Sequence, residues 1–202
     1  MLSRDEILRI FSQTGAMLTG HFLLTSGRHS DRYFQCARVL QYPRHAELLC
    51  HEMARQWQDE VKTVDTVIGP ALGGILVSYE VARALGARNI FAERENGVMT
   101  LRRGFNLSPQ EKVLVVEDVV TTGGSVREVI DLVRRAGAQV VGASALVDRS
   151  NGTVDLGVPF RALLTVPAVS YSPEECPLCR QGIPAVKPGS RDLSDAGGTP
   201  RG

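Results

Sequence analysis

Two adjacent carboxylates stand directly before a stretch rich in glycine and hydroxyl side chains. The apolar residues 113–116 are followed by Glu117 and Asp118 and then by residues 119–125, which contain two threonines, two glycines and a serine. Glycines let the backbone curl, amides at the start of the next helix point outward and hydroxyls add donors, so this turn could hold a phosphate. Carboxylates beside it would repel a polyphosphate, but they suit the vicinal hydroxyls of a ribose whose 5-phosphate lies in the turn. They would also lie where positive charge develops on an oxocarbenium-like sugar.

Other phosphate-binding classes have less support in the sequence. The turn lacks the Gly-Lys-Ser/Thr ending of a P-loop, and no Gly-x-Gly-x-x-Gly follows a predicted strand. Nucleotide hydrolysis and dinucleotide binding therefore lose support. The remaining alternative is an ordinary strand–helix turn in which Ser125 lies near the N-cap.

The elements that position this turn follow an alternating pattern. β-branched apolar runs separated by helical periodicity are typical of a mainly parallel sheet covered on both faces, so we predict a doubly wound α/β fold. The predicted strands are residues 64–68, 89–92, 113–116, 140–147 and 161–166, and the predicted helices are residues 44–59, 72–85 and 123–136. Ligands of such sheets bind beyond the carboxyl ends of the strands, where the polar residues stand.

The two ends of the chain have different patterns. Ser3 and Glu6 have the spacing of a capping box before a helix that is predicted to end at about Gln13. Residues 20–34 form two short apolar runs around a Ser-Gly turn and read as a hairpin-like segment. Residues 186–202 are rich in Gly, Pro, Ser and charge, which predicts a disordered tail.

Bulk composition narrows the partners. The 202 residues are 43% apolar with a net charge of +1, which predicts one globular domain and gives no reason to expect nucleic acid, a membrane or an acidic partner. The charged start and the lack of a membrane-length apolar run predict a cytoplasmic protein. Four scattered cysteines are predicted to be thiols.

Residues 113–125 resemble the 5-phosphoribosyl 1-diphosphate (PRPP) signature of the type I phosphoribosyltransferases. Three further segments, residues 22–30, 69–74 and 146–149, make the resemblance closest to the orotate-using members, over roughly residues 15–185. The resemblance implies the type I fold as a single domain over residues 1–185, with a small N-terminal hood of about residues 1–40.

The resemblance also implies a reaction. It is the transfer of ribose 5-phosphate from PRPP to orotate, giving orotidine 5-phosphate and diphosphate in UMP synthesis, with Mg²⁺ carried by PRPP and a homodimer with shared active sites. The implied orotate contacts are Thr121 and Arg149, and Phe34 could stack on the base. The implied PRPP contacts are Glu117, Asp118, Val119, Val120, Thr121, Thr122, Gly123, Gly124, Ser125, Ala71, Leu72 and Gly73.

The roles of two of these segments cannot be assigned from their residue types alone. A guanidinium at Arg149 matches a carboxylate in bidentate fashion, but it could equally pair with Asp148 or another acid. The glycines of residues 69–74 would let amides approach a diphosphate, or would simply make a tight turn. The lysine that many relatives carry in this loop is replaced here by Leu72-Gly73-Gly74.

Residues 93–104 correspond to a mobile basic loop of the orotate family. Asn96-Gly97 predicts a short hairpin, on which Arg94 and Arg103 are the predicted catalytic contacts to diphosphate. The alternative is a solvated face on which the arginines are balanced by Glu93 and Glu95.

The sequence leaves one motif unassigned and two rival functions. Cys176 and Cys179 form a lone C-x-x-C, for which a structural turn is favoured over a metal or redox site. A purine phosphoribosyltransferase would share the loop but offers no carboxylate for Arg149. A PRPP-binding regulator would also share it, but no DNA-binding segment is evident.

Overall fold

The computed structural model describes residues 2–24, 27–58, 64–166 and 169–187. The chain folds as two compact units. Unit 1 comprises the described residues of Met1–Ala16 and Gln35–Pro167, and unit 2 those of Met17–Phe34 and Ala168–Gly202. Unit 2 thus joins an N-terminal segment to a C-terminal one, whereas the predicted hood is a continuous segment of about residues 1–40. The single-domain assignment over residues 1–185 stays a prediction.

Unit 1 contains a six-stranded sheet in the order β5-β4-β3-β6-β7-β8. Strand β3 pairs in parallel with β4 and β6, β7 pairs in parallel with β6 and β8, and β5 is antiparallel to β4. The strands are β3 (Thr66–Pro70), β4 (Arg88–Glu95), β5 (Val98–Leu101), β6 (Lys112–Val120), β7 (Gln139–Asp148) and β8 (Phe160–Thr165). The predicted mainly parallel α/β sheet is confirmed, and β6 extends to Val120, so that Glu117 and Asp118 belong to the strand itself.

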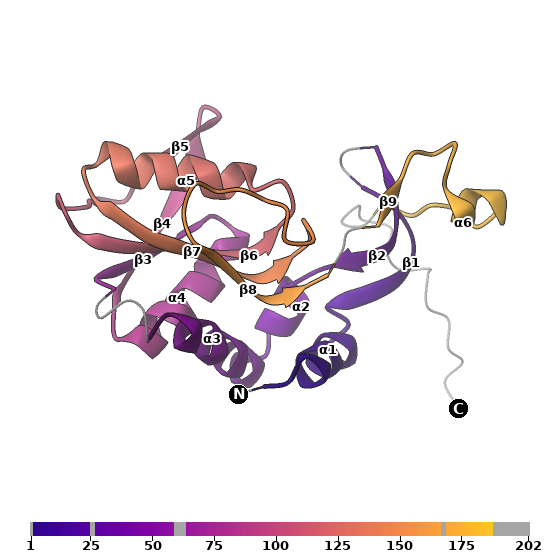
Figure 1. The fold of residues 1–202 in the computed structure, drawn as a ribbon, viewed down its shortest axis with the longest axis horizontal. Helices are drawn as coiled ribbons and strands as arrows, with labels where there is room; N and C mark the ends of the chain where they lie inside the picture. The colour runs from indigo at the N-terminus through magenta and orange to yellow at the C-terminus, as the bar shows by residue number, and fades with distance from the viewer. Residues whose placement is uncertain (1, 25–26, 59–63, 167–168, 188–202) are drawn as a thin grey trace. The chain divides into compact units, whose positions relative to one another are not determined.

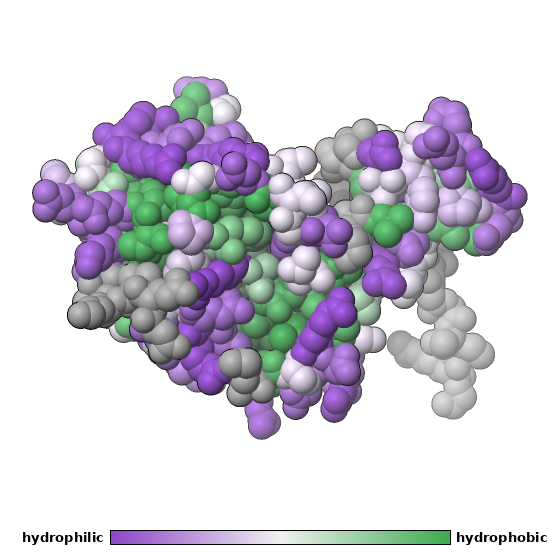
Figure 2. Space-filling view, in the orientation of Figure 1, coloured by the Kyte–Doolittle hydropathy of each residue, from purple (hydrophilic) through white to green (hydrophobic). Residues whose placement is uncertain are grey.

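Helices cover both faces of this sheet (Figure 1). Helix α5 (Gly124–Arg135) lies on one face, and α3 (Pro43–Gln58) and α4 (Gly73–Leu85) lie on the other. Alternation along β6 explains the layers, because Val113 and Val115 join the cluster formed with Val126, Val129 and other apolar residues of α5. The outward side of α5 is hydrophilic, and hydrophobic residues gather beneath it (Figure 2).

Two short helices complete unit 1. Helix α1 (Arg4–Gln13) begins with the predicted capping box, in which Ser3 Oγ accepts from the Glu6 amide at 3.2 Å and the Ser3 amide donates to the Glu6 carboxylate at 2.7 Å. Helix α2 (Ala37–Leu40) follows at the return from unit 2. In the part of the chain that the structure describes, no helix has the length and apolar character needed to cross a bilayer.

Unit 2 is a small sheet with one helical turn. Strands β1 (Met17–Leu23) and β2 (His29–Phe34) pair antiparallel, which confirms the predicted hairpin-like segment, and β9 (Ser170–Tyr171) pairs with β2. Helix α6 (Pro177–Arg180) carries the C-x-x-C motif. Thr25, Ser26 and residues 188–202 of the predicted tail lie outside the described residues, whereas Val186 forms a bridge with Phe22.

Candidate active site

The acidic pair of unit 1 lies near the carboxyl end of strand β6. The Glu117 side chain is buried, and Asp118 is partly exposed. One oxygen of Glu117 accepts from the Asp118 amide at 3.0 Å, and Oδ1 of Asp118 accepts from the Val119 amide at 2.7 Å. These bonds to the chain's own backbone orient both carboxyl groups at the carboxyl edge of the sheet, where ligands of parallel sheets bind.

The two carboxyl groups differ in burial, which affects how readily each one ionises. Burial, followed by the charge of Asp118, raises the pKa of Glu117 to about 9. A buried carboxyl group beside a second carboxylate avoids the cost of two adjacent negative charges by keeping its proton. At neutral pH this shift favours the protonated form of Glu117, which can donate a hydrogen bond.

This difference predicts how stability depends on pH. Between pH 4.5 and about 9 the folded chain holds a Glu117 proton that the unfolded chain has lost, so the free energy of unfolding falls as pH rises. The slope from this group is at most about 1.4 kcal/mol per pH unit. We expect Glu117→Gln to remove that slope. The free energy of unfolding of the variant, minus that of the unsubstituted chain, should therefore increase from pH 5.5 to pH 8.5 when both are measured by urea unfolding. Glu95→Gln, at an exposed position, is the control. If the free energy of unfolding depends on pH in the same way in both variants, the raised pKa of Glu117 is contradicted.

The turn after β6 forms a cradle at the start of α5. A cavity of about 280 Å³ is lined by Arg94, Glu117, residues 119–126 and Glu128. Gly123 has a φ of 78°, and a Cβ there would lie 2.7 Å from Leu156 and 2.8 Å from Val154. Only glycine fits that conformation and space. The positive end of the α5 dipole and the exposed Thr121 and Thr122 therefore face a site suited to an anion.

The neighbouring strand β3 brings the second predicted loop to the acidic pair. Thr66, Val67 and Ile68 of β3 pair with β6 in parallel, so the two strands end at the same edge. A Cβ on Gly73 would lie 2.7 Å from both carboxylate oxygens of Asp118. A side chain at position 73 would therefore have to displace the Asp118 carboxyl group, and the predicted segment Ala71, Leu72 and Gly73 adjoins the acidic pair.

Strand β7 brings the third predicted segment to the same edge. Val120 of β6 pairs with Asp148 of β7, and the Arg149 amide donates to the Val120 carbonyl at 2.7 Å. The Asp148 carboxylate accepts from the amides of Ser150 and Gly152, at 2.7 and 2.8 Å, so this acid shapes the turn after β7. Arg149 itself is buried, with 8% of its surface exposed.

Comparison with known proteins gives this arrangement a family. The phosphoribosyl transferase domain matches residues 40–167. An orotate phosphoribosyltransferase of Pelotomaculum thermopropionicum is 68% identical over 192 residues, which are 95% of this chain and 100% of that protein. The chain belongs to the orotate phosphoribosyltransferase family. The orotate phosphoribosyltransferase of Desulforamulus reducens is 63% identical over 96% of this chain and 100% of its own. The crystal structure of the Aeropyrum pernix orotate phosphoribosyltransferase has a TM-score of 0.66 at 28% identity, covering 79% of this chain and 93% of that one.

The basic hairpin of this orotate phosphoribosyltransferase family member has the predicted form. Strands β4 and β5 pair antiparallel up to Glu95 and Val98, around Asn96-Gly97. Arg94 forms a bidentate ion pair with Glu128 at 2.7 and 2.9 Å, and it lines the phosphate cradle.

The other two arginines of the hairpin are paired within it. Arg103 is bound by both oxygens of Glu93 at 2.8 and 2.9 Å, and Arg102 lies 3.4 Å from Glu95. Arg102 and Arg103 therefore have carboxylate partners within the hairpin, and the contact of Arg103 with diphosphate stays a prediction.

Sequence reasoning missed two residues that shape the cradle. The Arg127 guanidinium donates to the Thr122 carbonyl at 2.6 Å and to the Asp155 carbonyl at 2.7 and 3.1 Å, which braces the loop against the segment after β7. Glu128 holds Arg94. Both residues lie in the first turns of α5. Their partners include residues in other segments of the chain, and the helical spacing of α5 gives no signal for such contacts. Phe34 belongs to unit 2 and is buried, and its predicted contact with orotate stays a prediction.

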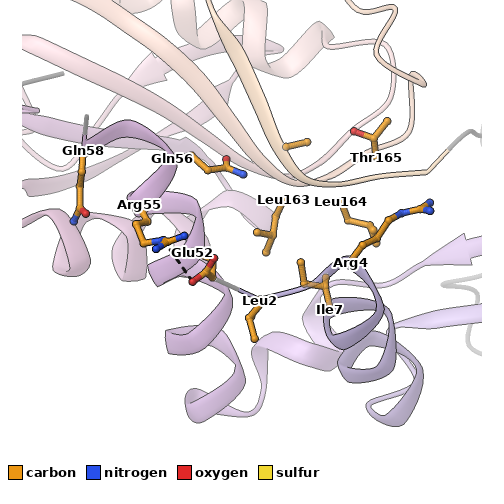
Figure 3. A pocket seen from close by; sticks show the side chains of 11 residues that line it. Leu2, Arg4, Ile7, Glu52, Arg55, Gln56, Gln58, Leu163, Leu164 and Thr165 are labelled. Carbon is orange, nitrogen blue, oxygen red and sulfur yellow. Dashed lines mark ion pairs between the residues drawn. The ribbon is translucent and has the colours of Figure 1, made fainter. Parts of the chain in front are cut away.

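A larger hollow of about 780 Å³ in unit 1 has a different character (Figure 3). Its apolar floor includes Ile7 and Leu164, and its rim carries the ion pair between Glu52 and Arg55 at 3.7 Å. Its lining residues come from α1, α3 and β8 and their flanks, and include none of the glycine-rich loop residues. The cradle after β6 is therefore the better candidate for the family's reaction.

Proposed function

We propose that this chain transfers ribose 5-phosphate from PRPP to orotate, producing orotidine 5-phosphate and diphosphate in UMP synthesis. The observation that carries the proposal is the convergence of three segments at one sheet edge in a member of the orotate phosphoribosyltransferase family. These are the acidic pair with its cradle, the loop of Gly73, and Arg149.

PRPP would lie across the first two segments. The 5-phosphate takes the cradle formed by residues 121–125, because amides, hydroxyls and the helix dipole converge there. The ribose hydroxyls face Asp118 and Glu117, and the diphosphate extends toward Ala71, Leu72 and Gly73. The contact between Gly73 and Asp118 supports this order, because it joins the sugar and diphosphate subsites.

The residues would then act by position and charge. As the bond to diphosphate breaks, positive charge develops on the sugar, and the Asp118 carboxylate stabilises it. Glu117, which keeps its proton, donates a hydrogen bond and adds no second negative charge near the anionic substrate. Orotate attacks through its ring nitrogen, so no covalent nucleophile of the protein is needed.

Orotate would be recognised by Arg149, with Thr121 and Phe34 as further contacts. A planar guanidinium binds a carboxylate through two parallel hydrogen bonds, and burial of Arg149 strengthens such a contact. A purine has no carboxylate to offer, so this residue supports orotate over adenine.

Mg²⁺ is the proposed cofactor, carried by PRPP. The donor chemistry fits, because the carboxyl group of Asp118 offers a hard oxygen, the ligand type that Mg²⁺ prefers. When bound, the ion neutralises charge on the diphosphate leaving group. Asp118 is the residue of this chain that would hold it.

Arg94 and Arg103 are proposed to contact the diphosphate from the hairpin. Each would have to exchange its carboxylate partner, Glu128 or Glu93, for a phosphate oxygen. These ion pairs are solvent-exposed, and such pairs contribute little stability, so the exchange is feasible.

A homodimer with shared active sites is also proposed, on the basis of an exposed apolar face along α4. Leu72, Leu76 and Tyr79 recur at helical spacing and are 84%, 53% and 57% exposed. Three large apolar side chains on one exposed face are typical of an interaction surface. The face begins at Leu72 in the proposed diphosphate loop, so a partner covering it would adjoin the active site.

We expect Leu76→Asp to convert the dimer to a monomer, because a charge would be buried in the interface, and to lower activity with it. Size-exclusion chromatography with light scattering measures the mass. Arg135→Glu, a charge change at another exposed position at the end of α5, is the control. A monomeric unsubstituted chain, or a Leu76→Asp variant that stays dimeric, would reject this interface.

The reaction itself is tested by a spectrophotometric assay with Mg²⁺, PRPP and one base at a time. We expect orotate to be consumed and adenine and xanthine to be left unchanged. If a purine is turned over and orotate is not, orotate is rejected as the substrate. If no base is turned over, the result favours a PRPP-binding regulator. The proposed compartment is the cytoplasm, where the four free cysteines would remain reduced.

A further inference from the structure

Unit 2 brings together two histidines and two cysteines. His21 and His29 come from β1 and β2, and Cys176 and Cys179 come from α6 and its N-cap. One ligand atom from each of the four residues lies within 4.8 Å of all the others. Cys179 and His29 are 150 residues apart in the sequence, so this cluster exists only in the folded chain.

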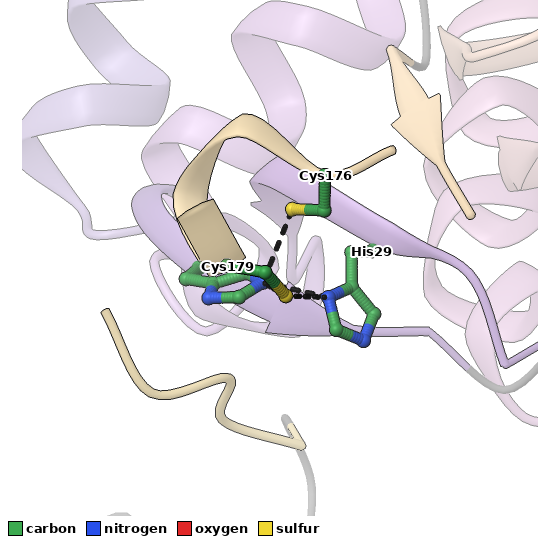
Figure 4. A group of neighbouring side chains, drawn as sticks. His29, Cys176 and Cys179 are labelled. Atoms are coloured by element: carbon green, nitrogen blue, oxygen red, sulfur yellow. Dashed lines mark hydrogen bonds between the residues drawn. The ribbon is translucent and has the colours of Figure 1, made fainter. Parts of the chain in front are cut away.

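The distances within the cluster fit a tetrahedral ion. His21 Nε2 lies 3.4 Å from Cys176 Sγ and 3.7 Å from Cys179 Sγ, and His29 Nδ1 lies 3.2 Å from Cys179 Sγ (Figure 4). The two ring nitrogens are 2.7 Å apart. Zinc bonds of about 2.0–2.1 Å to nitrogen and about 2.3 Å to sulfur give a tetrahedron with edges of about 3.3–3.8 Å. To reach that geometry the two ring nitrogens would move apart, and the most widely spaced ligand atoms, which lie within 4.8 Å, would move closer together.

A contact outside the cluster orients one histidine. His21 Nδ1 lies 2.6 Å from the Ile183 carbonyl, and a carbonyl can only accept. Nδ1 of His21 therefore carries the proton, and Nε2 presents its lone pair to the two sulfurs. Metal-binding histidines are typically held by such a bond to a backbone carbonyl.

The rest of unit 2 shows why a metal would matter there. Among its described residues, the buried apolar side chains are Phe22, Phe34 and Cys176. Units this small rarely bury enough apolar surface for stability, and a structural metal is one of the common remedies. The four ligands would tie the turn of α6 to the β1–β2 hairpin.

We propose that His21, His29, Cys176 and Cys179 bind one Zn²⁺ ion as a structural site of unit 2. Two thiolates and two imidazoles select zinc over the harder Mg²⁺. All four positions are filled by protein ligands, which is typical of a structural ion and leaves none open for substrate. Binding displaces the protons of both thiols, so affinity falls as pH is lowered.

The test uses the full chain without an affinity tag, reduced and dialysed against a weak chelator. Elemental analysis is expected to find about one zinc per chain. Replacement by Co²⁺ is expected to give the thiolate charge-transfer absorption and the visible bands of a tetrahedral site. Both signals should disappear in the double variant Cys176→Ser, Cys179→Ser. The single variant Cys179→Ser, changed at an exposed position, should bind zinc more weakly with reduced charge-transfer absorption.

Matched controls change a cysteine and a histidine elsewhere. Cys50→Ala and His51→Asn on α3 should keep about one zinc, whereas His29→Asn should lose it. Burial raises the pKa of the Cys50 thiol to about 12, so it stays protonated and is no competing ligand. The proposal is overturned if the reduced unsubstituted chain neither contains zinc nor binds added Zn²⁺, or if the double variant retains it. Metal content is independent of turnover, so this outcome does not depend on the orotate assay.

Discussion

Asp118→Asn is expected to lower kcat/KM for PRPP by about 10²- to 10³-fold, the cost of removing a preorganised electrostatic contact at the reacting centre. The amide keeps the shape of the side chain and can still accept from the Val119 amide, so the fold should be retained. The substitution removes a carboxylate, however, and with it the stabilisation of positive charge that develops on the sugar. Steady-state kinetics with both substrates varied, together with circular dichroism, measure the two effects.

Glu117→Gln is the matched comparison for this prediction. Because Glu117 is protonated at neutral pH, an amide reproduces its charge and much of its hydrogen bonding, so we expect a loss at least ten times smaller. Equal losses in the two variants would mean that both carboxyl groups ionise in the working enzyme. An Asp118→Asn variant with full activity would place the reacting sugar elsewhere.

Arg149→Ala is expected to raise the KM for orotate by about 10²-fold, within the range for truncating one partner of a buried charged contact. The KM for PRPP should change by a few fold at most. The reason is geometric: Arg149 follows β7, and strand β6 separates β7 from β3, which leads into the diphosphate loop at Gly73. Kinetics with each substrate varied at saturation of the other separate the two constants.

Arg149→Lys tests whether the guanidinium fork matters or only its charge. Lysine keeps the charge but offers a single ammonium, so we expect an intermediate rise in the orotate KM. Arg149 is buried, and urea unfolding of each variant should therefore accompany the kinetics. If both KM values rise together, Arg149 supports the fold of the site and does not select orotate.

Local patterns were sufficient for much of the fold. The capping box joins Ser3 to Glu6, only three positions further along the chain, and it begins α1 as predicted. Continuous apolar runs identified β3, β6, β7 and β8, because strands buried on both faces leave that pattern. Since parallel strands end at one edge, the polar segments after β3, β6 and β7 were predicted to meet there, and they do.

The sequence by itself therefore determined the sheet, the cradle after β6 and the family, because each depends on neighbours within one strand–turn–helix unit. Tertiary structure alone decided which groups meet across the fold. It paired Arg94 with Glu128, placed Gly73 against Asp118, and buried Glu117 enough to keep its proton. It also joined His21 and His29 to the C-x-x-C motif, for which the sequence favoured a structural turn. The physical reason is that burial and ligand geometry depend on distances in space, which residue spacing does not encode when the partners are 150 positions apart.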